Sequence, residues 1–479
     1  MQHYQDLKGA DGRAAFFRAD RHRARDLLTR VQPTVSIGNG RHPVYDLSIG
    51  GLSFFVADKS DVVEPGATVP LNVELGDRQF YRGTGAIVHV ERKSRGHRVG
   101  IDITDGYLDL DRLVALHDDV SVRAELDETP MLVRRHVSHD YRRLCGDVVY
   151  LLRRYRRILE PYEARLASDG AAAAARLAET YALCEERFLP EWRAHWREGG
   201  ALVRPFLDDA LAIRAVKAFT EAVVTPELID GPIWRRSYEK PLGYPGDYRI
   251  MSFVYNWTLE GETAYARLCH RVGIEVGRPV ATRLEPIGDA IEAAVAKGAG
   301  DDPVGITSLG SGPAFEVSQF LAQGRPRNPV TFTLIDQDRG ALSDANQRIF
   351  PLARKFADQA EANCLQLSFK QLFEQPDLVV ALPPQHLIYC AGLVDYLPAR
   401  QAQLLVAGLF QKLAPGGVLV IGNMKAGTDN VWPLKFVLDW DLVYRDEAEM
   451  AELAAFAKPS ALEVKVDDSG YNYLLFLTR

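Results

Sequence analysis

The chain has 479 residues, 47% of them hydrophobic and 25% charged, a composition typical of a folded globular protein and unlike that of a disordered one. This length exceeds what one hydrophobic core usually holds, so we expect about three domains. With a net charge of −7, the chain as a whole is not expected to bind polyanions, so any nucleotide site must be a local patch.

The cysteines and the apolar runs indicate the compartment. Cys145, Cys184, Cys269, Cys364 and Cys390 show no C-x-x-C spacing, which argues against a disulfide framework and a zinc site, so we expect no metal. The N-terminus lacks the apolar core of a signal peptide, and no run approaches the roughly 18 apolar residues that span a bilayer. We therefore expect a cytoplasmic protein without a membrane span.

The first predicted domain is small and rich in β-strands. Residues 1–19 are predicted to be a tail. Residues 20–105 contain short alternating runs separated by Gly, Pro, Asn and Asp, such as TVPLNVELGD at 68–77. Runs of this kind at regular intervals predict a small antiparallel β-barrel.

Two groups of polar residues in this domain form a candidate nucleotide site. Arg21 and Arg25 have R-x-x-x-R spacing, and Asp46, Ser48 and Gly51 have D-x-S-x-x-G spacing. Two guanidinium groups can clamp phosphates and stack on guanine, Asp and Ser can bind a guanine edge, and Gly permits close backbone approach. These motifs resemble those of the PilZ domain family, which implies that the five residues bind cyclic di-GMP.

An alternative for the arginines taken alone is a solvated basic face. In this part of the chain basic and acidic residues alternate, namely Arg18, Asp20, Arg21, Arg23, Arg25, Asp26 and Arg30. The matching D-x-S-x-x-G motif favours ligand binding over that alternative.

Residues 106–300 are predicted to be mainly helical, because apolar residues recur every three or four positions, as in HDYRRLCGDVVYLLRRYRRIL at 139–159. The pattern is interrupted by YEKPLGYPGDYRIM at 238–251. Pro245 and Gly246 suit the centre of a type II turn, and Asp247 is placed to cap the following helix. The interruption is either a turn with aromatic packing or a lid over a ligand pocket, with tyrosine hydroxyls directed at the substrate.

The last predicted domain, 301–479, has a different pattern. The apolar runs VGITSL, VTFTLID, CLQLSF, HLIYCAG and GVLVIGN alternate with helical stretches, which predicts a doubly wound parallel α/β sheet. ALEVKVDD and YNYLLFLTR, joined by Ser-Gly, predict an antiparallel terminal hairpin. This order resembles the seven-stranded sheet of class I S-adenosylmethionine-dependent methyltransferases. With the β-barrel and the helical region before it, the predicted fold class of the chain is multidomain α+β.

The candidate cofactor site follows the first two strands of this sheet. Gly310, Ser311 and Gly312 lie between a strand and a helix, where glycine allows the backbone to turn and approach a ligand. Asp336 ends the second strand and can accept hydrogen bonds from ribose hydroxyls. Asp338 is a second candidate, or simply the cap of the next helix.

The glycine spacing is G-x-G-x-A, whereas the dinucleotide fingerprint needs a third glycine where this chain has Phe315. The loop, the acid and the hairpin together favour a methyltransferase over a nicotinamide enzyme. The chain also departs from many methyltransferases, with Ser308 in place of an acid and Ala314 in place of the third glycine. Glu316 is a candidate for the missing carboxylate beside the methionine ammonium group; the alternative is a solvated helix face.

Five segments carry a second resemblance, KPLGYPGDYRIMSFVYN, SLGSGPAFEV, LIDQDRGAL, GLVDYL and GNM…DWDLVYRDEAEM. Over about 230–479 they resemble a bacterial family of biosynthesis proteins for a 3-hydroxypalmitic acid methyl ester signal. The resemblance implies that Gly310, Gly312, Glu316 and Asp336 hold S-adenosylmethionine. It also implies that the substrate is faced by Tyr244, Asp247, Tyr255, Asp395 and Tyr396. For Asp395 a helix-capping role is the alternative.

The predicted function is a cyclic di-GMP-responsive methyltransferase of a carboxylate or hydroxyl on a lipid-like molecule such as a 3-hydroxy fatty acid. A fatty carboxylate is already ionised at neutral pH, so its methylation needs alignment more than a strong base. Two alternatives stay open: a cyclic di-GMP receptor with a degenerate methyltransferase domain, and a methyltransferase of another small molecule or of a protein. The sequence also leaves open whether the helices at 130–225 form a homodimer.

Overall fold

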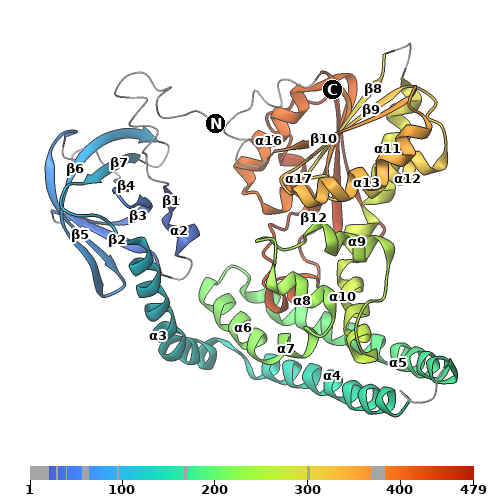
Figure 1. Cartoon of the computed structure of the whole chain (residues 1–479), viewed down its shortest axis with the longest axis horizontal. Helices are drawn as coiled ribbons and strands as arrows, with labels where there is room; N and C mark the ends of the chain where they lie inside the picture. The colour runs from blue at the N-terminus through green and yellow to red at the C-terminus, as the bar shows by residue number, and fades with distance from the viewer. Residues whose placement is uncertain are drawn as a thin grey trace. The chain divides into compact units, whose positions relative to one another are not determined.

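The structure is a computed structural model that describes residues 21–28, 31–38, 40–56, 64–93, 96–166, 171–298, 302–367 and 383–479. The predicted tail at 1–19 lies outside these residues. The chain divides into two compact units, Met1–Arg134 and Arg135–Arg479, with the boundary inside helix α3 (Leu110–His136) (Figure 1). None of the helices in the described ranges combines the length and the apolar character needed to cross a membrane.

The N-terminal unit contains the antiparallel barrel that the alternating runs predict. The sheet order is β1-β3-β2-β5-β6-β7-β4, and an additional pairing of β3 with β4 closes the barrel. The strands are β1 (His22–Arg23), β2 (Pro33–Ile37), β3 (Gly40–Ser48), β4 (Gly51–Val56), β5 (Thr68–Leu75), β6 (Arg78–Lys93) and β7 (Gly96–Ile103). The PilZ-like barrel is thereby confirmed.

The barrel encloses its own hydrophobic core, built from the alternate residues that point inward. Val35, Leu52 and Ile101 have no exposed surface. Leu113 in the first turn of α3 packs on the same core. The short strand β1, followed by helix α2 (Ala24–Leu27), pairs Arg23 with Asp46 of β3, so the pairing holds the arginine segment beside the D-x-S-x-x-G motif.

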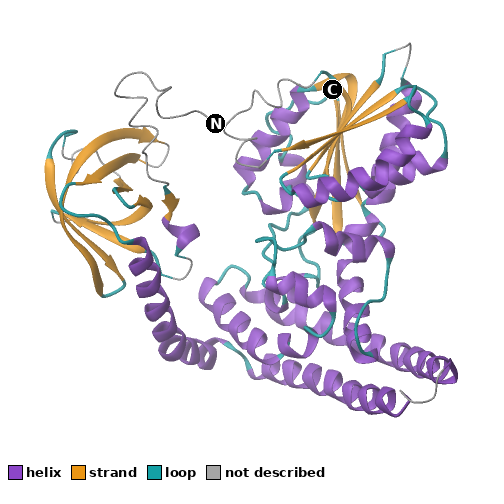
Figure 2. Ribbon diagram, in the orientation of Figure 1, coloured by secondary structure: helices purple, strands orange, loops and turns teal. Residues whose placement is uncertain are grey.

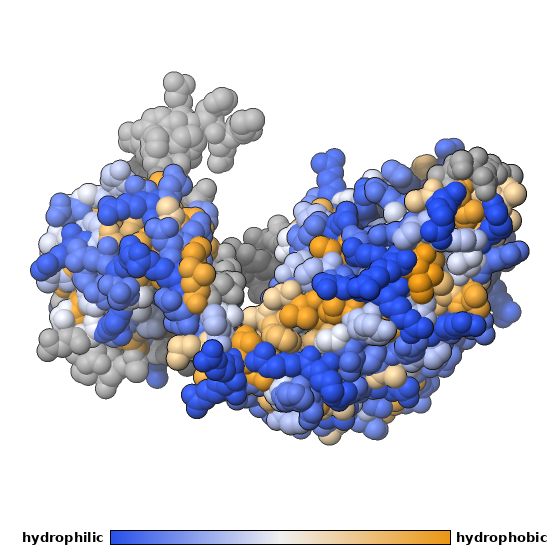
Figure 3. All heavy atoms as spheres, turned by 90° about the horizontal axis from the view of Figure 1, so that it is seen from below, coloured by the Kyte–Doolittle hydropathy of each residue, from blue (hydrophilic) through white to orange (hydrophobic). Residues whose placement is uncertain are grey.

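The C-terminal unit begins with the helices that the 3.6-residue pattern predicts. Most have a buried apolar stripe and a charged outer face, and Figure 3 shows hydrophilic residues over much of this unit's surface with apolar patches between them. The helices are α4 (His139–Leu166), α5 (Ala171–Val203), η3 (Arg204–Phe206), α6 (Ala210–Val223), α7 (Thr225–Leu228), α8 (Pro232–Glu239), α9 (Tyr248–Asn256), α10 (Ala264–Thr282) and α11 (Leu284–Lys297).

The sheet of this unit, drawn in orange in Figure 2, has the seven-strand order β10-β9-β8-β11-β12-β14-β13. The first five are parallel, and β14 is antiparallel to both of its neighbours. The strands are β8 (Val304–Leu309), β9 (Val330–Asp336), β10 (Ala360–Gln366), β11 (Gln385–Cys390), β12 (Leu413–Met424), β13 (Ala461–Val466) and β14 (Asn472–Thr478). The predicted doubly wound sheet with a terminal hairpin is confirmed, although β10 begins four residues before the run CLQLSF.

Helices cover both faces of the sheet. Residues of α11, α12 (Phe315–Gln323) and α13 (Arg339–Lys355) pack on one face, and residues of α16 (Ala399–Gln411) and α17 (Glu447–Glu452) pack on the other. The strand order reverses between β8 and β11, so the chain leaves these two strands toward opposite faces. In open α/β sheets the crevice at this point, outside the carboxyl ends of the strands, is where ligands bind.

The helical region and the sheet share one core. Trp192 of α5 lies 5.9 Å from the ring of Trp234 and 6.1 Å from that of Trp432, which belongs to the π-helical segment η5 (Trp432–Val437) after β12. The Trp432 Nε1 donates a hydrogen bond to the Tyr141 hydroxyl of α4 at 2.9 Å. This aromatic core fixes the helices on the sheet and thereby positions the segments that line the candidate site.

Candidate functional site

A cavity at the carboxyl ends of β8, β9 and β11 brings together most of the predicted cofactor and substrate residues. It therefore occupies the crevice expected from the strand order. The predicted residues that line it are Tyr244, Tyr255, Gly310, Ser311, Gly312, Glu316, Asp336, Asp395 and Tyr396. Asp247 and Asp338 are not among its lining residues.

The loop after β8 forms an open cradle at one end of the cavity. Gly310 and Gly312 have φ angles of 65° and 52°, in the left-handed region that favours glycine. A Cβ on Gly312 would meet no atom within 4 Å, so the backbone there is open to a ligand. The buried Ser311 hydroxyl has no hydrogen-bond partner. An unfilled cradle with an unpaired polar atom fits a bound polar ligand.

Ala314 stands where many related loops have a third glycine, yet it keeps that glycine's conformation. Its φ is 45°, and its side chain has no exposed surface. A left-handed alanine costs about 1–2 kcal/mol relative to a right-handed one. The loop therefore keeps the required backbone path at the expense of local strain.

Asp336 lies at the end of β9, beside this loop. Its two carboxylate oxygens accept hydrogen bonds from the backbone N–H groups of Gly312 and Asp338, each at 2.8 Å. Burial raises the pKa of this carboxyl. Each oxygen retains a further lone pair, so the carboxylate can also accept hydrogen bonds from the hydroxyls of a ribose.

Asp338 has the capping role that the sequence offered as the alternative. Its side chain caps α13 by accepting the Gly340 N–H at 2.7 Å, and it accepts the Tyr244 hydroxyl at 2.9 Å. Asp338 does not line the cavity, and its assignment as a cofactor residue stays a prediction.

Glu316 of α12 points inward. Only 6% of this residue is exposed, and its Oε1 accepts the Tyr389 hydroxyl at 2.7 Å. Tyr389 of β11 lies in register with Ser308 of β8, so the Glu316 carboxylate lies near the position where Ser308 replaces an acid. Burial raises the pKa of Glu316. The solvated-face alternative for Glu316 is therefore wrong.

The segment Lys240–Asp247, here called the lid segment, extends along one side of the cavity. Tyr244 contacts the cap of α13, as described above. Pro245 and Gly246 line the cavity, the Pro245 carbonyl accepts the Tyr396 hydroxyl at 3.5 Å, and the Tyr396 hydroxyl also accepts the Trp440 Nε1 at 2.9 Å. Gly246 has a φ of 71°, as the central glycine of a type II turn requires.

Asp247 ends the lid segment as a structural residue. Its side chain is fully buried and caps α9 by accepting the backbone N–H groups of Arg249 and Ile250 at 3.0 and 3.3 Å. The same carboxylate accepts the Arg236 Nε at 2.8 Å. The predicted cap is confirmed. The substrate-facing role is corrected, because the carboxylate is directed to the helix end and to Arg236 and not to the cavity.

Tyr255 and Asp395 also line the cavity. The Tyr255 ring of α9 packs 4.9 Å from Phe315, and burial raises the pKa of its hydroxyl. Asp395, in the short helix η4 (Val394–Tyr396), accepts the Met424 N–H at 2.6 Å. Burial raises the pKa of Asp395 to about 6. Its side chain caps no helix, so the capping alternative for Asp395 is wrong.

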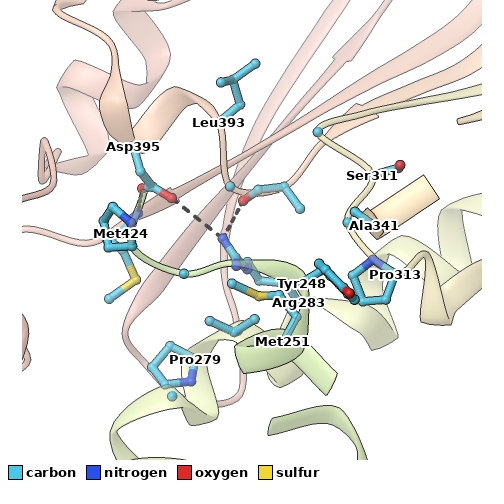
Figure 4. Close-up of a pocket in the computed structure, with 18 of the residues that line it drawn as sticks. Tyr248, Met251, Pro279, Arg283, Ser311, Pro313, Ala341, Leu393, Asp395 and Met424 are labelled. Carbon is cyan, nitrogen blue, oxygen red and sulfur yellow. Dashed lines mark hydrogen bonds and ion pairs between the residues drawn. The ribbon is translucent and has the colours of Figure 1, made fainter. Parts of the chain in front are cut away.

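The sequence interpretation missed the buried cation of the cavity, Arg283, at the junction of α10 and α11. The side chain lies 3.7 Å from the Asp395 Oδ2 and donates to the Ala391 carbonyl, and dashed lines mark both contacts in Figure 4. It is one of 57 Lys and Arg residues and has no motif around it. No local pattern distinguishes it from a surface arginine.

In the barrel, the two predicted motifs meet at Asp46. Arg21 Nη1 lies 3.1 Å from Asp46 Oδ1, which also accepts the Ser53 hydroxyl at 2.7 Å. The Ser48 hydroxyl donates to the Gly51 carbonyl at 3.4 Å. A Cβ on Gly51 would lie 2.4 Å from the Ile101 carbonyl oxygen, so the motif glycine is required for strand packing as well. Arg25 is exposed on α2.

Arg98 of β7 joins this site without a sequence signal. It forms an ion pair with Asp46 and donates from Nε to the Ser53 hydroxyl at 3.1 Å. The guanidinium groups of Arg98 and Arg23 each lie 5.1 Å from the centre of the Tyr45 ring. Asp102 also lies 3.8 Å from Arg21 Nη2, so the three arginines exceed the two carboxylates by one positive charge, which suits an anionic ligand.

Comparison with known proteins supports the assignment of the first unit. Residues 15–116 match the family model described as PilZ domain. No curated protein matches the sequence of this chain.

Of the 643 solved chains that match this chain, three are as follows. A protein from Bordetella parapertussis titled a possible exported protein is 15% identical, with 56% of this chain and 86% of that chain covered and a TM-score of 0.37. Magnesium protoporphyrin IX methyltransferase from Synechocystis PCC 6803 with bound SAH is 12% identical, with 43% and 87% covered and a TM-score of 0.32. The CurJ carbon methyltransferase is 12% identical, with 74% and 97% covered and a TM-score of 0.35. Similarity at this level does not identify an activity.

Proposed function

We propose that the C-terminal unit is an S-adenosylmethionine-dependent methyltransferase. The observation that carries this proposal is the cavity at the switch point of a methyltransferase-type sheet, lined by the Gly310–Gly312 loop, Asp336 and Glu316. Asp336 would hold the ribose hydroxyls, the loop would follow the backbone of the cofactor, and Glu316 would face its ammonium group. When bound, the cofactor supplies an electrophilic methyl group.

The methyl acceptor that we propose is a carboxylate or hydroxyl on a lipid-like molecule, such as a 3-hydroxy fatty acid. The cavity lining also contains apolar side chains, which suit an acyl chain. Apolar residues of the lining include Met251, Val276, Val280, Leu284, Leu434, Trp440 and Leu442.

The residues of this chain contribute to the reaction mainly by orientation and exclusion of water. A fatty carboxylate is ionised at neutral pH, so alignment of its oxygen with the methyl group is the main requirement. For a hydroxyl acceptor, Asp395 with its pKa of about 6 is largely ionised at pH 7 and can accept the proton. The lid segment would close the cavity to water, and Tyr255 would donate a hydrogen bond to the acceptor.

A product assay tests this proposal. The full chain is incubated with S-adenosylmethionine and a panel of plain and 3-hydroxy fatty acids, and methyl esters and ethers are detected by mass spectrometry. The Asp336→Ala variant removes the carboxylate that would bind the ribose hydroxyls. Methylated product from the wild type that falls strongly in Asp336→Ala supports the proposal. No product, together with no S-adenosylhomocysteine binding by calorimetry, would favour a receptor with a degenerate domain.

We further propose that the barrel binds cyclic di-GMP through Arg21, Arg25, Asp46, Ser48 and Gly51 and that binding regulates the methyltransferase. The two motifs, the match to the PilZ domain and the cluster of positive charge around Asp46 support this. Calorimetry of the full chain with cyclic di-GMP tests binding. The Arg21→Ala variant removes one proposed ligand contact and should bind more weakly. Allostery requires that the dinucleotide change cofactor affinity or turnover, and equal values with and without it would refute regulation.

A further inference from the structure

Arg283 is a buried cation with an unused donor. Only 6% of the residue is exposed. Its Nη1 donates to the Ala391 carbonyl, and its Nε has no hydrogen-bond partner. A guanidinium group has five N–H donors and no acceptor, and a buried donor without a partner is unfavourable. No acceptor from the described residues therefore pairs with the Arg283 Nε in this cavity.

The nearby acid does not fill that role. Asp395 Oδ2 lies 3.7 Å from Arg283 Nη1, beyond hydrogen-bond distance, and its Oδ1 accepts the Met424 N–H. The buried Arg445 lies close by and donates to the Val394 carbonyl at 3.1 Å. Asp395 is shared between the two buried arginines, and it leaves the Arg283 Nε without a hydrogen-bond partner.

The position of Arg283 directs it toward the switch point. Ala391 and Gly392 directly follow β11, beside the Gly310–Gly312 loop that follows β8. A Cβ on residue 392 would lie 3.2 Å from Arg283 Nη1, so glycine leaves the guanidinium group uncovered on that side. Figure 4 shows the Arg283 side chain reaching from the helical side of the cavity toward Asp395 and the end of β11.

We propose that Arg283 binds a carboxylate inside this cavity through its Nε and a terminal nitrogen. Paired N–H groups of a guanidinium match the two oxygens of a carboxylate in a bidentate contact. This rests on the proposed function, which offers two sources of that group: the methionine part of the cofactor and the acid of the acceptor. Neighbouring Glu316 would face the ammonium group if the carboxylate is that of the cofactor.

Calorimetry of the full chain tests the proposal and distinguishes the sources. S-adenosylhomocysteine carries the methionine carboxylate, 5′-methylthioadenosine lacks it, and 3-hydroxypalmitate represents the acceptor. The variants are Arg283→Met, which keeps most of the apolar stem, and Arg283→Lys, which keeps the charge without the fork. Arg278→Met, the matched control, removes an exposed arginine of the adjoining helix α10.

If the cofactor supplies the carboxylate, Arg283→Met lowers the affinity for S-adenosylhomocysteine by about tenfold or more and leaves 5′-methylthioadenosine unchanged. If the acceptor supplies it, the affinity for 3-hydroxypalmitate falls instead. Wild-type affinities for all three ligands in Arg283→Met overturn the proposal. If Arg283→Met fails to fold by circular dichroism, Arg283→Lys decides by the same criteria.

Failure of the proposed function gives a different result. In that case the wild-type chain binds neither nucleoside, whatever the residue at 283. The carboxylate proposal is then judged on 3-hydroxypalmitate alone: a loss of affinity in Arg283→Met supports it, and no difference from the wild type overturns it.

Discussion

Gly246 allows a sharp test of how the lid segment is built. A Cβ at this position would lie 2.2 Å from Trp440 Cζ2, whereas ordinary contacts are at least 3.4 Å, so Gly246→Ala requires a shift of about 1.2 Å. Trp440 is buried and tethered through its Nε1 to Tyr396, so it cannot move away freely. Overpacking of this kind costs about 1–3 kcal/mol.

The backbone adds a second cost. At a φ of 71° an alanine costs about 1–2 kcal/mol. The expected destabilisation of Gly246→Ala is therefore about 2–5 kcal/mol. Gly243 in the same segment is the matched control, because its φ is 82° but a Cβ there would meet nothing within 4 Å. Gly243→Ala should cost about 1–2 kcal/mol, the backbone cost alone.

The free energy of unfolding of the C-terminal unit is measured by urea titration, followed by tryptophan fluorescence. In a Trp440→Ala background, Gly246→Ala should cost no more than Gly243→Ala does in the wild type, because the clashing ring is absent. Equal costs for the two glycine substitutions in the wild-type background would refute the claim that Gly246 is required by contact with Trp440.

Three further predictions concern single side chains. Burial raises the pKa of Asp395 from 3.8 to about 6, so ionisation of this carboxyl destabilises the folded state. As the pH rises from 4 to 6, the free energy of unfolding of the wild type should therefore fall by up to about 3 kcal/mol relative to that of Asp395→Asn. Parallel pH profiles of the two proteins in urea titrations would refute this. Asp247→Ala should lower the free energy of unfolding by about 2–4 kcal/mol and Asp247→Asn by less, because only Asn retains a capping oxygen; equal losses contradict the cap. In calorimetry Arg98→Ala should weaken cyclic di-GMP binding about tenfold or more, whereas the exposed Arg82→Ala should not; equal affinities exclude Arg98 from the site.

The sequence alone determined the features that depend on local pattern. Alternating residues predicted the barrel strands, and buried apolar runs predicted the parallel strands and the terminal hairpin. The capping role of Asp247 and the turn at Pro245–Gly246 follow from turn and cap chemistry within a few residues. The Gly310–Gly312 loop was recognisable because its position between a strand and a helix is itself a local feature.

Only the tertiary structure decided which polar side chains face the cavity. It turned Glu316 inward to Tyr389, and it directed the Asp247 carboxylate to Arg236 and away from the cavity. Arg283 contacts a carbonyl 108 residues away, and Arg98 pairs with an acid 52 residues away. Contacts of this range depend on how whole strands and helices pack, and no local period or motif encodes which charged residue becomes buried.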